Sequence, residues 1–400
     1  MTGTHPRDLA DPLAARRDLF VTGGDVVSYL DGNSLGRPLT ASLARVEAFL
    51  RDEWAGRLIR GWDDGWMELP LTVGDELGRV ALGAASGQVA IGDSTTVLIY
   101  KLVRAALDAR PGRTEIVIDR DNFPTDRYIV EAIAADRGLT IRWIETDAAA
   151  GVTTDQVAAV VGPDTALTLF SSVAYRSGYL ADVESITDLA HRAGALAMWD
   201  LSHSAGVLPT PLDDWGVDLA VGCGYKYLNG GPGAPAFLYV RGELQDQLSQ
   251  PIHGWLGSRT PFLMGQGYEP ADGIRAFLSG TPPVIGIQPM RDMIALIDEV
   301  GLDAVRAKSV ALTQYAVELC DELLPEARLV SPRDPAERGG HITIAHERFA
   351  AIMPALWARG VIPDFRQPDG IRLGMSPLST SFAEVQTAVR AIRELLDEPA

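Results

Sequence analysis

The chain has 400 residues, of which 35 are basic and 53 acidic, and its net charge is −18. This length exceeds a single small core and fits one large domain with a smaller one. The negative charge disfavours nucleic acids and anionic membrane surfaces, because their phosphate groups repel the protein. With 46% hydrophobic and 22% charged residues, the composition is that of a folded globular protein and excludes a disordered one.

Cysteine and histidine are sparse. The two cysteines, Cys223 and Cys320, and six scattered histidines provide neither a disulfide framework nor the spacing of a metal site. The first eight residues are polar, and no stretch approaches the ~18 apolar residues of a membrane span. We therefore expect a cytoplasmic protein that binds no metal.

Residues 93–240 alternate short apolar runs with helical patterns. This alternation is typical of β-α units and predicts an α/β fold with a mostly parallel, doubly wound sheet. The expected strands are 114–119, 140–144, 166–170, 196–199, 219–223 and 236–240, and the expected helices are 97–108, 125–137, 154–161 and 183–193.

The remaining sequence predicts a smaller α+β domain. A helical region at 289–324, broken near Gly301, leads to strand-like runs at 341–345 and 371–375. A last helix is expected after Ser381, where Ser381 and Glu384 match the capping-box pattern. We expect residues 61–289 to form the large domain, and residues 1–60 and 290–400 to form the small one.

The chain contains three lysines, Lys101, Lys226 and Lys308, beside 32 arginines. Lys226 follows an expected strand and lies among glycines and aromatic residues, so its amine should be desolvated and suited to Schiff-base chemistry. Asp200 follows another strand, and ligands of parallel sheets bind at such strand ends. A lysine and a carboxylate in one crevice are what pyridoxal phosphate (PLP) requires. The alternatives are an exposed turn lysine and a helix-capping aspartate.

Four segments carry a family resemblance. They are Tyr-Leu-Asp-Gly-Asn-Ser-Leu-Gly at 29–36, Trp-Asp-Leu-Ser-His-Ser-Ala-Gly at 199–206, Gly-Tyr-Lys-Tyr-Leu-Asn-Gly-Gly-Pro-Gly at 224–233 and Phe-Leu-Ser-Gly-Thr-Pro-Pro at 277–283. Together they resemble the kynureninase family of PLP-dependent hydrolases, within the fold-type I, aminotransferase class V superfamily. The resemblance extends from about residue 25 to 380.

This resemblance implies an activity and an assembly. The expected reaction is hydrolysis of L-kynurenine to anthranilate and L-alanine in tryptophan catabolism, through a PLP aldimine and ketimine with Cβ–Cγ cleavage. The expected assembly is a homodimer with a shared active site. Some eukaryotic members of the family carry asparagine where this chain has Thr281. Because threonine is shorter, we expect unmodified kynurenine to be preferred over 3-hydroxykynurenine.

The resemblance also implies residue roles. Lys226 would form the aldimine, Asp200 would pair with the pyridinium nitrogen, and Tyr225 is the candidate acid. The remaining expected cofactor contacts are Thr95, Thr96, Phe123, Pro124, Thr125, Asp126, Ser171, His203 and, from the neighbouring protomer, Trp255 and Thr281 of the partner subunit.

Several of these residues also have a structural interpretation. Thr95 and Thr96 precede a helix, where they could bind phosphate or act as ordinary caps. Phe123 could stack on the pyridine ring or belong to the core. Arg372 could bind the substrate carboxylate or form a structural ion pair. Trp62 could line the aryl pocket or be a buried hydrophobe.

The alternative functions are a cysteine desulfurase and a noncatalytic binding module. A cysteine desulfurase needs a nucleophilic cysteine on a mobile loop, but Cys320 lies within a predicted helix. A noncatalytic binding module would be expected to lose the lysine, the carboxylate or the arginine, and Lys226, Asp200 and Arg372 are all present.

Overall fold

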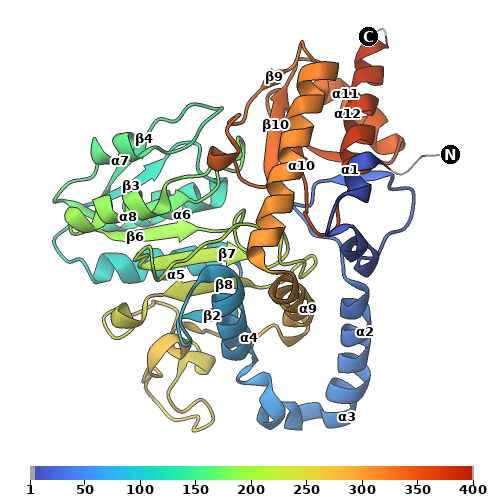
Figure 1. The fold of residues 1–400 in the computed structure, drawn as a ribbon. Helices are drawn as coiled ribbons and strands as arrows, with labels where there is room; N and C mark the ends of the chain where they lie inside the picture. Colours follow the sequence, from blue (N-terminus) through green and yellow to red (C-terminus); the bar gives the residue numbers. More distant parts are fainter. Residues whose placement is uncertain (1–4, 399–400) are drawn as a thin grey trace.

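The structure, a computed structural model, describes residues 5–398. Residues 1–4, part of the expected polar N-terminus and of the predicted small domain, and residues 399–400 lie outside this range. Two separate sheets form the framework, and Figure 1 shows the larger sheet apart from the strands β9 and β10 of the smaller one.

The larger sheet has seven strands in the order β2-β8-β7-β6-β5-β3-β4. The strands are β2 (Val89–Gly92), β3 (Glu115–Asp119), β4 (Thr140–Ile144), β5 (Thr165–Ser171), β6 (Leu196–Asp200), β7 (Leu219–Cys223) and β8 (Ala236–Val240). All neighbours are parallel except β8, which is antiparallel to both β2 and β7. The prediction of a mostly parallel sheet is confirmed, and β2 is an additional edge strand.

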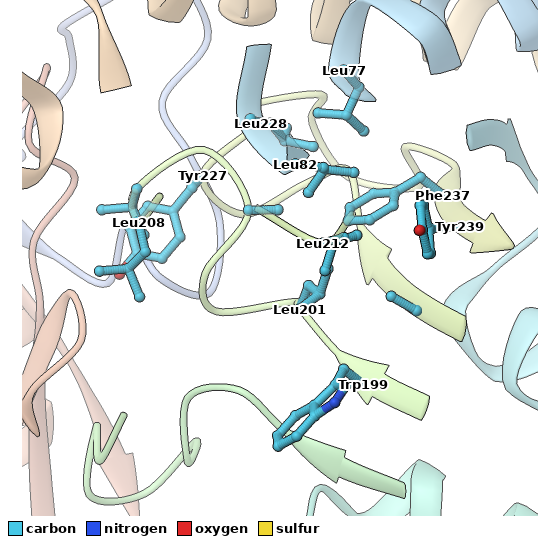
Figure 2. Close-up of a cluster of buried hydrophobic side chains, with 14 of the residues drawn as sticks. Leu77, Leu82, Trp199, Leu201, Leu208, Leu212, Tyr227, Leu228, Phe237 and Tyr239 are labelled. Carbon is cyan, nitrogen blue, oxygen red and sulfur yellow. The ribbon is translucent and has the colours of Figure 1, made fainter. Parts of the chain in front are cut away.

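Helices cover both faces of this sheet. They include α4 (Leu69–Leu77), α5 (Thr95–Asp108), α6 (Pro124–Arg137), α7 (Thr154–Ala158) and α8 (Val183–Arg192). Because both faces are covered, β6, β7 and β8 are buried along their whole length. Adjacent residues alternate between faces: Met198 packs into one cluster with α5, and Trp199 into the other. Figure 2 shows Trp199 in that second cluster, with Leu201, Phe237 and Tyr239.

The smaller sheet has the order β1-β11-β12-β10-β9. Its strands are β1 (Ser28–Leu30), β9 (Arg328–Leu329), β10 (His341–Ala345), β11 (Val361–Arg366) and β12 (Gly370–Gly374). They pack with α10 (Leu302–Leu323), α11 (Phe349–Ala358) and α12 (Phe382–Asp397). The capping box is present, since Ser381 accepts from the Glu384 N–H and Glu384 accepts from the Ser381 N–H.

The N-terminal segment joins the two parts. After α1 (Pro6–Leu9), β1 pairs in parallel with β11, so residues 28–30 belong to the C-terminal sheet. The helices α2 (Thr40–Ala48) and α3 (Ala55–Arg57) then form an arm that extends away from both sheets in Figure 1. The chain leads from the large sheet back to the smaller one through α9 (Val284–Val300). This helix ends at Gly301 (φ 85°), where the sequence predicted a break. The domain boundaries at 60/61 and 289/290 remain a proposal, and the second of them falls inside α9.

Short helical turns complete the chain at Ala14–Leu19, Phe49–Trp54, Leu58–Arg60, Trp62–Trp66, Gly78–Leu82, Gly242–Leu244, Trp255–Gly257, Gly273–Phe277 and Pro335–Glu337. Across residues 5–398, every helix is too short or too polar to cross a lipid bilayer.

Candidate active site

A pocket of about 200 Å³ opens where strands of the large sheet end. Asp200 is the last residue of β6, Ser171 is the last of β5, and Lys226 lies three residues beyond β7. Parallel strands direct these carboxyl ends to one edge, which is why residues distant in sequence meet there. The lining residues are Ser94, Thr95, Thr96, Phe123, Thr125, Ser171, Tyr175, Asp200, Ser202, His203, Tyr225 and Lys226.

Nine of the predicted cofactor contacts are therefore in one pocket. Sequence reasoning missed Ser94, Tyr175 and Ser202. Ser94 is the N-cap of α5 and was identifiable from the Ser-Thr-Thr run. Tyr175 lies in a loop and carries no sequence signal that points to the pocket.

Lys226 is buried, with 8% of its surface exposed. Its Nζ lies 3.0 Å from Nε2 of His203 and 5.6 Å from the centre of the Phe123 ring. The lysine loop is held by the 29–36 segment, because the Gly36 N–H donates to the Tyr225 carbonyl at 2.9 Å. A Cβ on Gly36 would come within 2.5 Å of the Lys226 carbonyl, so this close approach requires glycine.

Two carboxyl groups lie beside the lysine. Oδ1 of Asp200 accepts the Ser202 N–H at 2.8 Å, and 6% of the residue is exposed. Asp126, in the first turn of α6, is fully buried, and among residues 5–398 neither of its carboxyl oxygens has a hydrogen-bond partner. Burial, with the neighbouring charges of Asp200 and Asp119, raises the pKa of Asp126 well above its usual range. Such an orphaned buried group indicates a site built to receive a polar ligand.

His203 is buried behind Lys226. Burial, followed by the charge of Lys226, lowers the pKa of His203 well below its usual range, so the neutral imidazole is favoured. Its Nδ1 has no hydrogen-bond partner in the described part of the chain. His341, the first residue of β10, lies with its ring centre 5.4 Å from that of His203. This contact between β10 and the turn after β6 was not predicted.

The start of α5 forms one wall of the pocket. Thr95 and Thr96 lie in its first turn, where backbone N–H groups are unpaired within the helix. Oγ1 of Thr96 lies 2.7 Å from Oγ1 of Thr125, which links this turn to α6. Free N–H groups and small hydroxyls at a helix start suit a phosphate group.

Arg372 lies outside the pocket lining and is 1% exposed. Its guanidinium donates to Asp364 at 2.8 Å, to Ser34 Oγ at 2.6 Å and to the Tyr175 carbonyl at 2.8 Å. Arg372 therefore forms a structural ion pair with Asp364, which is the alternative role predicted for it from the sequence. Tyr175 also lines the pocket, so the arginine lies directly behind the pocket wall.

The other predicted residues lie apart from this pocket within the chain. Trp62 packs edge-on against Trp66 and Trp255, with ring centres 5.6 and 5.9 Å apart. Thr281 is exposed and Trp255 is half-buried. Of the predicted cofactor contacts, Pro124, Asp126, Trp255 and Thr281 do not line the pocket. Both cysteines are buried, and burial raises the pKa of Cys320 to about 12.

Within residues 5–398, no group of three or more His, Cys, Asp or Glu side chains is placed to hold a metal ion.

Sequence comparison places these features among known proteins. Residues 305–392 match the family described as the kynureninase C-terminal domain, and residues 74–242 match the Cys/Met metabolism PLP-dependent enzymes. Kynureninase from Pseudomonas fluorescens is 39% identical, over 98% of this chain and 94% of that protein. Kynureninase from Burkholderia pseudomallei strain 1106a is 41% identical over the same shares.

Solved structures share the fold at lower identity. An apo cysteine desulfurase from Thermococcus onnurineus NA1 superposes with a TM-score of 0.79 and 19% identity, covering 99% of both chains. A variant of C-DES with glycine covalently linked to its PLP cofactor has a TM-score of 0.81 and 18% identity, covering 92% of this chain and 96% of that one. These similarities establish the fold-type I architecture.

Proposed function

This chain belongs to the kynureninase family, and from that premise we propose that it hydrolyses L-kynurenine to anthranilate and L-alanine with PLP as its cofactor. The main support for this proposal is the pocket that brings together Lys226, Asp200 and the threonines at the start of α5. When bound, PLP supplies an aldehyde that condenses with an amine and a ring that accepts electrons from the bound amino acid.

The residues present fit this cofactor. Lys226 supplies the amine, Asp200 supplies a carboxylate for a ring nitrogen, and Thr95 and Thr96 supply phosphate donors. The buried carboxyl of Asp126 lies behind this lining. Phe123 lies beside Lys226, where a flat ring can stack.

Lys226 is also the proposed base. Its Nζ is fixed 3.0 Å from the neutral His203 ring, which can accept a hydrogen bond and hold the amine in place. An amine so positioned can take the proton from the substrate α-carbon and return it elsewhere. Lys226, Asp200 and His203 are buried, which limits the access of water to this transfer.

Tyr225 is the proposed acid for the substrate β-carbon. Burial raises the pKa of Tyr225, so the phenol retains its proton at neutral pH and can donate it. We expect Tyr225→Phe to bind the cofactor normally and to slow turnover by about 10²-fold or more, the scale of a lost acid–base group. Rapid-mixing absorbance and anthranilate fluorescence measure the two effects. Tyr227→Phe is the control, because this neighbouring buried phenol lies outside the pocket; equal rates in both variants would contradict the assignment.

Arg372 is proposed to bind the substrate carboxylate by exchanging its contact with Asp364. We expect Arg372→Ala to raise KM by roughly 10²-fold, because a buried charged hydrogen-bond partner is removed, with a smaller change in kcat. Arg338→Ala is the matched control, since Arg338 is fully buried but bonds to Pro332 and Arg333 carbonyls. If both variants lose only thermal stability, Arg372 is a structural ion-pair residue. Steady-state kinetics and thermal melting separate these outcomes.

A homodimer with a shared site is proposed as the active unit. The arm from α2 onward exposes large apolar side chains, as does the 262–264 loop. They are Leu43, Leu50, Trp54, Leu58, Ile59, Phe262, Leu263 and Met264. Exposed apolar groups in such number are typical of an association surface. Trp255 and Thr281 do not line the pocket of their own chain, as expected if they serve the neighbouring subunit.

Substrate preference and location complete the proposal. We retain unmodified kynurenine as the preferred substrate, because Thr281 offers a short hydroxyl, and we propose a cytoplasmic location, where free thiols such as Cys223 and Cys320 persist.

Product analysis tests the function. Purified protein incubated with L-kynurenine should release anthranilate and alanine in equal amounts, and L-cysteine should yield no sulfide. The cysteine desulfurase alternative requires a reactive thiol, whereas Cys320 is buried in α10 and Cys223 is buried at the end of β7. Sulfide release without anthranilate would overturn the proposal.

A further inference from the structure

Lys101 is buried in α5 with no exposed surface, and the proposed chemistry does not use it. Its Nζ donates to Oδ2 of Asp93 and to the carbonyl of Phe277, both at 2.7 Å. Burying an ammonium group is costly unless it is paired in this way. Asp93 is close in sequence to Thr95 and Thr96, and Phe277 is close in sequence to Thr281. The proposed function assigns these threonines to the cofactor.

Asp93 connects two such segments. It directly precedes Ser94, Thr95 and Thr96, and its backbone adopts a positive φ of 51°. The same Oδ2 that binds Lys101 also accepts the Ser279 hydroxyl at 3.2 Å. One carboxyl oxygen therefore joins the phosphate-binding turn to the 277–281 segment.

The 277–281 segment in turn supports residues assigned to the partner's site. The Ser279 carbonyl accepts the Leu256 N–H at 3.0 Å, which positions the turn that carries Trp255. Thr281 follows two residues later on the same segment. Lys101 is thus bonded on one side to the turn serving its own pocket and on the other to the segment predicted to serve the partner's pocket.

We propose that Lys101 is a positioning residue that couples binding of the cofactor phosphate to association of the two subunits. This inference rests on the proposed function, because it assumes PLP in the pocket and a shared dimeric site. Phosphate binding should order the 93–96 turn, and the Asp93–Lys101 pair should transmit that order to the 277–281 segment. By thermodynamic linkage, the factor by which phosphate binding strengthens association should equal the factor by which association strengthens phosphate binding.

The test compares PLP with pyridoxal, which lacks the phosphate, on full-length protein from which the cofactor has been removed. We expect Lys101→Met to weaken PLP binding by about tenfold or more, the scale of coupling between contacting groups, and to change pyridoxal binding by less than about twofold. The matched control is Lys308→Met, because Lys308 is another buried lysine, paired with Asp11 away from the pocket. This control should keep the wild-type ratio of the two affinities.

Sedimentation velocity over a dilution series gives the second readout. Addition of PLP should tighten the wild-type dimer, and Lys101→Met should remove most of that effect. If Lys101→Met does not fold, Ser279→Ala serves instead, because it removes only the Ser279 hydroxyl that donates to Asp93. This variant should reduce the effect of PLP on association with little change in melting temperature.

The inference is overturned if Lys101→Met weakens PLP and pyridoxal equally, if it behaves like Lys308→Met, or if Ser279→Ala leaves the PLP effect on association unchanged. It is also overturned if the wild-type protein is a fully active monomer. A wild-type protein that attaches neither compound to Lys226 would instead overturn the proposed function. The two failures are therefore distinguishable.

Discussion

Lys226→Ala is expected to abolish covalent cofactor attachment and to reduce kynurenine turnover by roughly 10⁴-fold, because one amine acts both as the attachment point and as the base. The two other lysines cannot replace it. Lys101 is bonded to Asp93 and Phe277, and Lys308 is paired with Asp11. The Lys226 amine contacts a neutral histidine in the pocket, which leaves it available for reaction.

Borohydride reduction followed by peptide mass spectrometry measures this directly. The wild-type protein should carry reduced cofactor on the peptide containing Lys226, and the variant should carry none. Lys308→Met should be labelled like the wild type. A labelled Lys226→Ala protein, or one with normal turnover and no added amine, would show that another residue holds the cofactor.

Asp200→Asn is expected to retain the fold and lose about 10²- to 10³-fold in turnover, the scale of losing one preorganised electrostatic contact. The amide has the same shape and its oxygen can still accept the Ser202 N–H, so the turn after β6 should remain. The neutral side chain cannot hold a ring nitrogen protonated, which is the property that lets the ring accept electrons.

Asp119→Asn is the matched control for Asp200→Asn. Asp119 also ends a strand, is similarly buried, and lies outside the pocket lining. Steady-state kinetics should show a lower turnover rate for Asp200→Asn than for Asp119→Asn, and thermal melting should show the same stability for both variants. Near-wild-type turnover of Asp200→Asn would assign the ring-nitrogen contact to another group, with the unpartnered Asp126 as the first candidate.

The large sheet was predictable because most of its strands are short apolar runs separated by helical patterns. The expected runs at 140–144, 219–223 and 236–240 coincide with β4, β7 and β8. The edge strands β2, β1 and β9 were missed, because a strand of two to four residues with one covered side has too little periodicity to recognise. The parallel pairing of β1 with β11 joins residues more than 300 positions apart, and no local pattern encodes it.

Within the site, the sequence by itself determined that Lys226 and Asp200 follow strands and that threonines begin α5. Strand-end position and helix capping are local properties. The family resemblance added the other predicted contacts, and nine of the predicted residues line one pocket. Local properties could not reveal the carboxyl group that faces Arg372, the orphaned oxygens of Asp126 or the His203–His341 contact.

Those features depend on which elements pack together. Asp364 and Arg372 lie opposite each other across the β11–β12 pair, and His341 approaches His203 only because β10 packs beside the turn that follows β6. The bonding of Lys101 to the 277–281 segment likewise joins residues 176 positions apart. Burial, and with it the pKa of each titratable group, follows from the solvent excluded by the whole fold. The residue types and their spacing were therefore set by the sequence, whereas the charge state and partners of each group were decided by tertiary packing.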